Sequence, residues 1–388
     1  MFVRIGNTPR DYAWGSTTAI AGLLGTEPSG GPEAELWLGA HPGSPARVLD
    51  PTLADGAATL AEWERTSDLP YLLKVLAADG PLSLQAHPSP EQARAGFERE
   101  NAAGLAADSP DRNYKDPFHK PELIFALSDP FEALCGFRDP AESRAALERL
   151  AAAGPGGAVL SGFARTLDGE PGTVLRRATE WLLGEDDDVD LLVAEVVAAA
   201  RALPDDRDAD TVRMLDDAFP GDPGIVLALL LNRATLRPGQ VLYLPAGNIH
   251  AYLRGLGIEL MAASDNVLRG GLTRKRIDVP ELVSVLDFSP IRATPLAPEH
   301  PAAGVEVFRP DVPDFQLSRI ELSGEVTSAE LSLPGTAIAL CTEGTVELTG
   351  ATDSLVLARG EAALVTADEG TLSVASGPGT LFVATPNR

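Results

Sequence analysis

The 388-residue sequence is poor in cysteine, in aromatic residues and in long apolar runs. Its two cysteines, Cys135 and Cys341, lie too far apart to form a metal-type spacing or a disulfide framework, which is consistent with a reducing compartment. The longest apolar run, "GIVLALLLN", is too short to span a bilayer, and the start "MFVRIGNTPRDYAWGS" lacks the apolar stretch of a signal peptide. We therefore expect a cytoplasmic protein without a membrane segment.

Positive charge is also scarce. Lys and Arg together number 31 against 56 Asp and Glu, which gives a formal net charge of −25. This balance argues against nucleic acid or an anionic membrane as the main partner. An acidic surface also repels an anionic substrate unless basic side chains gather locally, so basic residues near a candidate site carry extra weight. Nothing in the sequence indicates an obligatory protein partner.

The spacing of apolar residues and the frequency of Gly and Pro change along the chain, and these changes predict its division into parts. Residues 1–138 are short strand-like runs broken by Gly and Pro, with one helix expected at "SPEQARAGFERENAAG" behind Ser89 as N-cap. Residues 139–235 are rich in Ala and Leu at helical spacing, as in "TVLRRATEWLLG" and "GIVLALLLNRATL", and predict an all-α insertion. Short strand-like runs return over 236–295, the expected second part of the catalytic domain, and over 296–388, the expected C-terminal domain. The stretch "PIRATPLAPEHP" between these two parts is the best linker candidate.

The stretch "LSLQAHPSPEQ", residues 82–92, contains a candidate half of a metal site. Its alternation is typical of a strand, and a strand places Gln85 and His87 on one face. An imidazole suits zinc, and a glutamine amide oxygen is a less common neutral ligand. Taken alone, the tripeptide fits a polar strand end better than a metal site.

The segment "GQVLYLPAGNIH" strengthens the metal interpretation. Its spacing of Gly239, Pro245, Gly247 and His250 resembles the second signature of the cupin superfamily, in which a strand, a tight turn and a returning strand aim a histidine into a barrel. "QAH" then resembles the His-x-His of the first signature. The resemblance implies a mainly β fold, with a cupin-type jelly-roll catalytic domain and a second, jelly-roll-like domain at the C-terminus. No histidine follows His300, so we expect that second domain to bind no metal.

A metal site of this kind also needs a carboxylate. Glu91 has the usual cupin spacing after His87, but it lies where a helix is expected and can simply favour the helix dipole. Glu122, in "FHKPELIF", begins a strand-like run and can face inward, with Lys120 beside it at two-residue spacing. We favour Glu122 over Glu91. The remaining histidines are more typical of turns, rims or the surface, namely His41, His119 and His300.

Six collinear motifs between residues 7 and 278 resemble type I mannose-6-phosphate isomerases: "NTPRDYAWGS", "AELWLGAHP", "KVLAADGPLSLQAHP", "DPFHKPEL", "PAGNIHAY" and "GIELMAASDNVLRGGLTRKRID". The resemblance implies one Zn²⁺ per chain held by Gln85, His87, Glu122 and His250. It places Lys74, Lys120, Tyr252, Glu259, Asp265 and Arg269 around a sugar-phosphate substrate, with Arg269 as the catalytic arginine. Arg274 departs from the family pattern, which often has Pro at this position.

The implied reaction interconverts mannose 6-phosphate and fructose 6-phosphate by moving a proton between C2 and C1 through an enediol. Asp265 or Lys120 is the favoured base, and Glu259 is a further carboxylate of the same region. Arg269 cannot act as a base at neutral pH and is expected to stabilise the enediolate. The run "RGGLTRKRID" is the densest basic segment, so Arg274 or Lys275 is expected to attract the phosphate.

Two alternatives stay open from the sequence. Another metal-dependent cupin enzyme, such as a dioxygenase or a different sugar-phosphate isomerase, could share the histidines, although iron dioxygenases prefer two histidines and one carboxylate, and Gln85 would be a surplus ligand. A non-catalytic sugar-sensing cupin could dispense with Arg269 and the candidate acids and bases, all of which are present.

Overall fold

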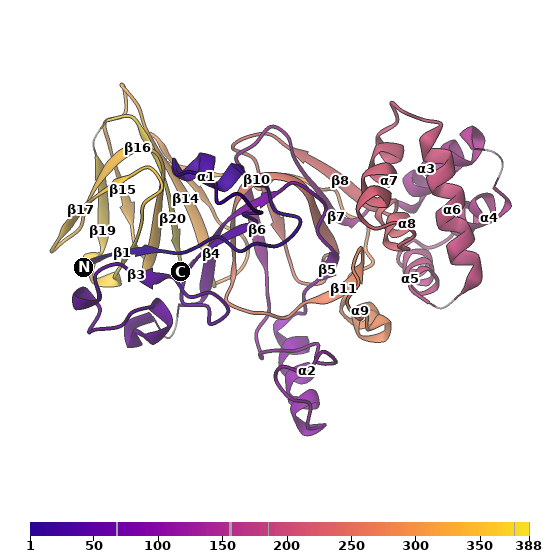
Figure 1. The fold of residues 1–388 in the computed structure, drawn as a ribbon, viewed down its shortest axis with the longest axis horizontal. Coiled ribbons are helices and arrows are strands. Elements are labelled where there is room, and N and C mark those ends of the chain that lie inside the picture. The colour runs from indigo at the N-terminus through magenta and orange to yellow at the C-terminus, as the bar shows by residue number, and fades with distance from the viewer. Residues whose placement is uncertain (67–68, 155–156, 185, 376, 388) are drawn as a thin grey trace.

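The computed structural model describes residues 1–388 except 67–68, 155–156, 185, 376 and 388. Its strands form two sheets that lie next to each other, and a group of helices caps one end of the molecule (Figure 1). The nine-stranded sheet contains β2 (Glu35–Leu38), β4 (Tyr71–Ala78), β5 (Leu84–Ala86), β6 (Glu122–Ala126), β7 (Phe131–Phe137), β8 (Leu231–Leu236), β9 (Val241–Leu244), β10 (His250–Ala262) and β11 (Leu268–Gly271).

Strand β10 holds the nine-stranded sheet together. Its first part pairs with β5 and β7, and its second part, from Gly255 onward, pairs with β4 and β6. The strand changes partners at Gly255, which has a φ of +129°. A Cβ there would lie 2.9 Å from the backbone of Phe131, so only glycine fits this bend.

The eleven-stranded sheet combines the start of the chain with its C-terminal part. Its strands are β1 (Phe2–Gly6), β3 (Arg47–Val48), β12 (Glu299–Ala302), β13 (Val305–Phe308), β14 (Gln316–Leu322), β15 (Ser328–Ser332), β16 (Ala337–Thr349), β17 (Ser354–Ala358), β18 (Ala362–Val365), β19 (Thr371–Ala375) and β20 (Gly379–Thr385). Because β1 pairs with β18 and β3 pairs with β1, the expected first part of the catalytic domain, 1–138, contributes two strands to the other sheet. The jelly-roll arrangement and the domain bounds remain predictions.

The α-helices of the described residues are α1 (Ala19–Leu24), α2 (Pro90–Ala102), α3 (Pro140–Ala153), α4 (Ala158–Thr166), α5 (Pro171–Leu182), α6 (Asp187–Arg201), α7 (Arg207–Ala218), α8 (Gly224–Ala228) and α9 (Val279–Val285). Single-turn 3₁₀ helices occur at Pro51–Leu53, Leu60–Glu62, Glu64–Thr66 and Ala367–Glu369. Ser89 caps α2 in a reciprocal capping box with Gln92, so the expected N-cap is confirmed.

Helices α3 to α8 pack together beyond the ends of β7 and β8 (Figure 1). Helix α6 shows why they cluster, since its buried residues Val189, Leu192, Val193 and Val196 recur every three or four positions. The apolar core that they form continues into β5 and β10 through Leu84 and Ala251. The expectation of a helix across "GIVLALLLNRATL" is wrong in its second half. The helix ends at Ala228, and Leu231–Leu236 is strand β8, because its backbone pairs with β7.

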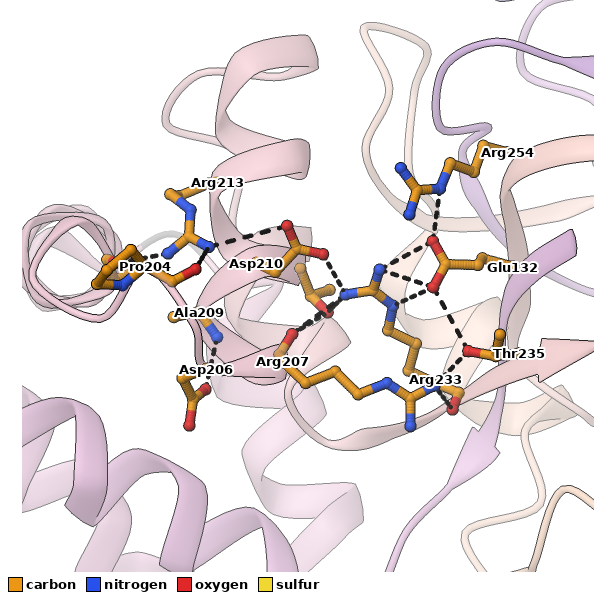
Figure 2. A network of polar contacts seen from close by, with 12 residues as sticks. Glu132, Pro204, Asp206, Arg207, Ala209, Asp210, Arg213, Arg233, Thr235 and Arg254 are labelled. Atoms are coloured by element: carbon orange, nitrogen blue, oxygen red, sulfur yellow. Dashed lines mark hydrogen bonds and ion pairs between the residues drawn. The ribbon is translucent and has the colours of Figure 1, made fainter. Parts of the chain in front are cut away.

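A partly buried ionic network joins the helices to the sheet (Figure 2). Arg233 of β8 donates to both carboxylate oxygens of Glu132 on β7, at 2.8 and 2.9 Å, and to Asp210 of α7 at 2.8 Å. Arg254 of β10 lies 2.6 Å from the same Glu132 carboxylate, and Arg207 at the start of α7 donates to Thr235. The network therefore fixes α7 against three neighbouring strands. Over the described part of the chain, no helix has the length and apolarity that a membrane crossing requires.

Candidate metal centre

The register of three neighbouring strands brings several candidate site residues together. In the antiparallel pairing of β5 and β10, Gln85 stands opposite His250, and in the pairing of β5 and β11 it stands opposite Arg269. Residues directly opposite each other in antiparallel strands project from the same face of a sheet. Three side chains from sequence positions up to 184 residues apart are thus placed in one row across three strands.

His87 and Glu122 meet His250 of this row. The Nε2 atom of His87 lies 3.3 Å from one carboxylate oxygen of Glu122, and the Nε2 atom of His250 lies 3.2 Å from the other. The Gln85 amide lies 3.3 Å from the same His250 atom. The three ligating atoms of the two histidines and the carboxylate fall within 4.8 Å of one another, and all three side chains are about 1 % exposed.

Backbone carbonyls fix the orientation of both imidazoles. Nδ1 of His87 lies 2.7 Å from the carbonyl oxygen of Asn266, and Nδ1 of His250 lies 3.0 Å from that of Asn248. A carbonyl only accepts hydrogen bonds, so each Nδ1 carries the proton and each Nε2 keeps a lone pair directed at the cluster. The buried Nε2 of His87 has no hydrogen-bond partner among the described residues. Two such nitrogens beside one carboxylate suit a divalent cation of the zinc type.

Sequence reasoning missed the role of Asn266. Its side chain is fully buried, accepts from the backbone of Lys115 at 2.7 Å and donates to the carbonyl oxygens of Asp116 and Phe118. One residue therefore orients His87 through its backbone and fastens the segment that leads to Lys120 through its side chain. The available signal was the "SDN" string, which the sequence alone also allows as an ordinary turn between strands.

The electrostatics of the cluster favour an ionised carboxylate and a neutral imidazole. Burial disfavours the charged form of Glu122, but Lys120, whose Nζ lies 2.9 Å away, and His87 lower the pKa of that carboxyl well below its ordinary value. Burial lowers the pKa of His87 to about 4, against the opposing attraction of Glu122. At neutral pH the site therefore offers one anionic ligand and uncharged imidazole.

A second buried polar group lies on the neighbouring strands. Lys74 of β4 contacts Glu259 of β10 at 2.9 Å and Glu35 of β2 at 3.8 Å, and its ammonium lies 4.9 Å from the centre of the Trp37 ring. Burial opposes the charge of Lys74, but Glu259, Glu35 and Glu122 outweigh it and raise the pKa of the amine. Burial in turn raises the pKa of Glu259.

Glu35 and Trp37 are further residues that the sequence did not single out. The Trp37 indole donates to Glu35 at 2.8 Å, and Trp37 stands in register with Lys74. The signal was present in "AELWLGAHP", where Glu35 interrupts a strand that is otherwise apolar and completely buried. A buried carboxylate in such a strand needs a cation or several donors.

Tyr252 lies between the two polar groups. Its ring packs edge to face against Phe131, with centroids 5.4 Å apart, and lies 6.4 Å from the ring of His250. The phenol is almost completely buried, and burial raises its pKa well above the ordinary value. Tyr252 can therefore act as a neutral hydroxyl group and not as a phenolate.

Asp265 lies at the edge of the site. Its carboxylate is half exposed and lies 3.4 Å from Nε2 of His41, and this contact lowers its pKa. Asp265 and His41 line a cleft of about 580 Å³ together with Lys115, Asp116 and Phe118. His41, expected at a turn or rim, is buried and close to a candidate catalytic carboxylate.

The basic segment, residues 269–278, contains both unpaired cations and a cation that is paired with carboxylates. Arg276 contacts Asp278 at 3.2 Å and Asp111 at 3.7 Å, so it is neutralised. Within the described residues, Arg269, Arg274 and Lys275 have no carboxylate partner within ion-pair distance. Proximity to Arg269, with burial second, lowers the pKa of Lys275, and burial lowers that of Arg269. Arg269 and Lys275 are therefore two unneutralised cations close together, and such a pair attracts an anion.

Three residues that the sequence offered as alternatives lie outside the metal cluster. Glu91 stands exposed in the first turn of α2, where it accepts a hydrogen bond from Ser89, and it is not part of the cluster. His119 pairs with Asp314 at 2.8 Å. His300 is exposed in β12.

The fold and the site define a class of protein: it is built largely of β-strands and has a buried His–His–carboxylate cluster suited to a divalent metal. A family model described as phosphomannose isomerase type I, catalytic domain, matches residues 2–140. The mannose-6-phosphate isomerase of Escherichia coli (strain K12) is 39 % identical over 366 residues, covering 90 % of each chain. The human mannose-6-phosphate isomerase is 32 % identical over 383 residues, covering 87 % of this chain and 86 % of its own.

A solved structure of mannose 6-phosphate isomerase bound with zinc and yttrium superposes with a TM-score of 0.86 at 35 % identity and covers 100 % of both chains. The K86A mutant of phosphomannose isomerase from Salmonella typhimurium gives a TM-score of 0.87 at the same identity and coverage. The chain therefore belongs to the type I mannose-6-phosphate isomerase family, which is a family of enzymes.

Proposed function

We propose that this enzyme interconverts mannose 6-phosphate and fructose 6-phosphate with one Zn²⁺ per chain, held by Gln85, His87, Glu122 and His250. The observation that carries the proposal is the pair of imidazoles whose Nδ1 protons are given to backbone carbonyls, leaving both Nε2 atoms directed at a buried carboxylate. Family membership supports the reaction, and the zinc in the related solved structure supports the choice of ion.

The donor set explains why a glutamine is useful. Gln85 and the two imidazoles are neutral, so Glu122 alone offsets the charge of a divalent ion, and the site keeps a formal charge of +1. The Gln85 amide presents either its oxygen or its nitrogen after a half turn, so the same position supplies an oxygen ligand. A zinc ion bound there would supply electrophilic polarisation of sugar oxygens during the isomerisation.

The chain's own residues supply the rest of the chemistry. Isomerisation moves a proton between C2 and C1, and negative charge develops on the oxygens of the enediol. Arg269, in register with Gln85 and without a carboxylate partner among the described residues, would stabilise that charge. Lys74 and Glu259 are mutually neutralising and buried, which suits hydrogen bonding to sugar hydroxyls, and Tyr252 adds a neutral hydroxyl.

Lys120 and Asp265 are the candidate bases for the proton transfer. Lys120 contacts the carboxylate of Glu122, whereas Asp265 lies at the rim next to His41. The two are separated by measuring incorporation of solvent deuterium at C1 of fructose 6-phosphate. Asp265→Asn with full turnover and unchanged exchange would eliminate the aspartate, and the same result for Lys120→Met would eliminate the lysine.

The phosphate is assigned to the unpaired cations of the basic segment. Arg274 and Lys275 are exposed and lie beyond Arg269 along the chain, while Arg276 is already bound to two aspartates. In a protein with a net charge of −25, such a local excess of positive charge is needed to retain an anionic substrate.

The test of the whole proposal is a coupled assay for fructose 6-phosphate formed from mannose 6-phosphate. We expect activity in the zinc-replete protein, loss of activity after chelation, and recovery after zinc is restored. Absence of activity in the zinc-replete protein overturns the reaction. Full activity after verified removal of metal overturns the zinc requirement while leaving the reaction intact.

A further inference from the structure

The carboxylate of Asp222 connects the group of helices to the basic segment. One of its oxygens accepts from the backbone N–H of Gly224 at 2.7 Å, which is a local contact at the start of α8. The same oxygen accepts from Leu272 at 2.9 Å, and the other oxygen accepts from Thr273 at 3.2 Å. A simple helix cap needs only the first contact, so the two bonds to residues about 50 positions away require another explanation.

The backbone that Asp222 binds has an unusual conformation. Leu272 has a φ of +53°, which is rare for a residue other than glycine, and Gly271 before it has a φ of +130°. Leu272 is nonetheless almost completely buried. Such a conformation persists only where the surroundings determine it, and the two hydrogen bonds from Leu272 and Thr273 to Asp222 do so.

The two segments also touch through their backbones. A Cβ on Gly271 would lie 2.8 Å from the Cα of Gly224, and a Cβ on Gly224 would lie 2.9 Å from the nitrogen of Leu272. Only two glycines allow this approach. The start of α8 and the end of β11 therefore form one close-packed junction, with the Asp222 carboxylate filling its polar side.

The position of this junction gives it a function. Arg269 lies in β11, which ends at Gly271, and Arg274 and Lys275 lie in the bend 272–275 that follows, so the path of this bend sets where the later cations lie relative to the first. Arg269 is fixed independently by the register of β11 with β5. Arg274 and Lys275 lie outside any strand or helix and are exposed. Their position therefore depends on the bend whose first two residues Asp222 holds.

We propose that Asp222 is a positioning residue for substrate: from the group of helices it fixes the start of the bend 272–275, so that Arg274 and Lys275 join Arg269 around the phosphate of the sugar. The inference rests on the proposed assignment of the phosphate to these cations. It gives the helices α3 to α8, which contribute no residue to the metal cluster, a direct part in substrate binding.

Steady-state kinetics of Asp222→Ala test the proposal. We expect the KM for mannose 6-phosphate and the inhibition constant of inorganic phosphate to rise together, by roughly ten-fold, with kcat changed much less. A purely structural role would lower the fraction of active enzyme, and hence the apparent kcat, while leaving KM and the inhibition constant unchanged. That second pattern overturns the proposal.

Two further variants keep the test decisive. Asp222→Asn retains one acceptor oxygen and serves if the alanine variant does not fold; we expect a smaller rise of KM in the same direction, and an unchanged KM overturns the proposal. Asp139→Ala is the matched control, because Asp139 caps α3 of the same helical group through the N–H of Ala141 and is exposed. It is expected to leave KM and phosphate inhibition unchanged.

Lys275→Ala separates failure of this inference from failure of the proposed function. If Lys275→Ala and Asp222→Ala both leave KM and phosphate inhibition unchanged, the phosphate does not bind at this segment. If only Lys275→Ala raises them, the phosphate assignment stands and the role of Asp222 is wrong. If Asp222 acts through Lys275, the double variant Asp222→Ala/Lys275→Ala shows a KM close to that of Lys275→Ala alone. A double variant whose KM rises by the product of the two single effects contradicts that coupling.

Discussion

Arg269 stands directly opposite Gln85 in the antiparallel register of β11 and β5, and Gln85 in turn stands opposite His250 of β10. A candidate metal ligand therefore lies between a second candidate ligand and the candidate catalytic arginine. Because side chains in such a row are spaced by the distance between strands, Arg269 is held next to the metal cluster without touching its carboxylate.

This relationship predicts a specific effect of Arg269→Lys. Lysine keeps the charge but lacks the planar, multiply donating guanidinium, so it cannot reproduce the same contacts to enediolate oxygens. We expect kcat to fall by about 10²-fold or more, with zinc content and the unfolding temperature unchanged. Retention of kcat within two-fold would remove Arg269 from the chemistry.

Glu122→Gln is expected to weaken metal binding. The substitution removes the only anionic ligand and the partner of Lys120, and both effects disfavour a cation in the site. Glu91→Gln is the matched control, because Glu91 is an exposed glutamate only four residues after His87. Metal analysis by mass spectrometry after dialysis should give one zinc per chain in the control and markedly less in Glu122→Gln. Equal metal content in the two variants contradicts the ligand assignment.

The metal-free protein is expected to lose stability in mild acid because of His87. Burial lowers its pKa to about 4 in the folded state, against about 6.5 in the unfolded chain. Above pH 6.5 the imidazole is neutral in both states. Between about 6.5 and 4 the unfolded chain binds the proton and the folded one does not, so the free energy of unfolding decreases as pH falls, by about 3 kcal/mol across the window.

The measurement is denaturant unfolding of chelator-treated protein at pH 7 and at pH 4.5, with His87→Gln as the comparison. The variant should lose the part of the pH dependence that comes from the imidazole. Identical pH dependence in both proteins would show that another group is responsible. Zinc release should follow the same window, since protons compete with the ion for Nε2.

The network in Figure 2 predicts a large stability effect of Arg233→Ala. Removing the guanidinium leaves Glu132, which is 4 % exposed, with the half-exposed Arg254 and a long hydrogen bond of 3.4 Å from the Thr235 hydroxyl. We expect the free energy of unfolding to fall by about 3 kcal/mol or more. Arg254→Ala is the control and should cost about 1 kcal/mol or less, because Arg254 is half exposed and Glu132 keeps its three hydrogen bonds from Arg233. Equal costs for the two variants would show that Arg233 is not the principal counter-ion.

Local patterns in the sequence were sufficient for several features. The alternation around Gln85, the Ser89 cap with Gln92 three residues later, and the helical spacing of Val189, Leu192 and Val196 depend on neighbouring residues alone. The metal-cluster histidines were recognisable because glycine and proline spacing marks the turn before His250.

Features that depend on distant pairing were not accessible in this way. The apolar run before Leu231 continues a helical pattern, and only its hydrogen bonds with β7 make Leu231–Leu236 a strand. The pairing of β1 with β18 joins residues more than 350 positions apart, so no local pattern indicates it. Asn266 gains its role from the segment that begins at Lys115, about 150 positions earlier, and Glu35 from Lys74 on the neighbouring strand β4. Asp222 gains its role from a bend about 50 residues downstream.

The position of the helices α3 to α8 has a consequence for folding. They lie between β7 and β8, which are antiparallel neighbours whose pairing includes Phe137 with Leu231. These strands form a hairpin whose connecting loop is itself a folded body of about 90 residues, and closing a disordered loop of that length costs about 4 kcal/mol in chain entropy. If the helices form first, the two strand ends are brought together in advance and much of that cost is removed. The pairing of β7 with β8 would then wait for the helices to assemble. Changes in helix stability would therefore alter the folding rate without altering any strand.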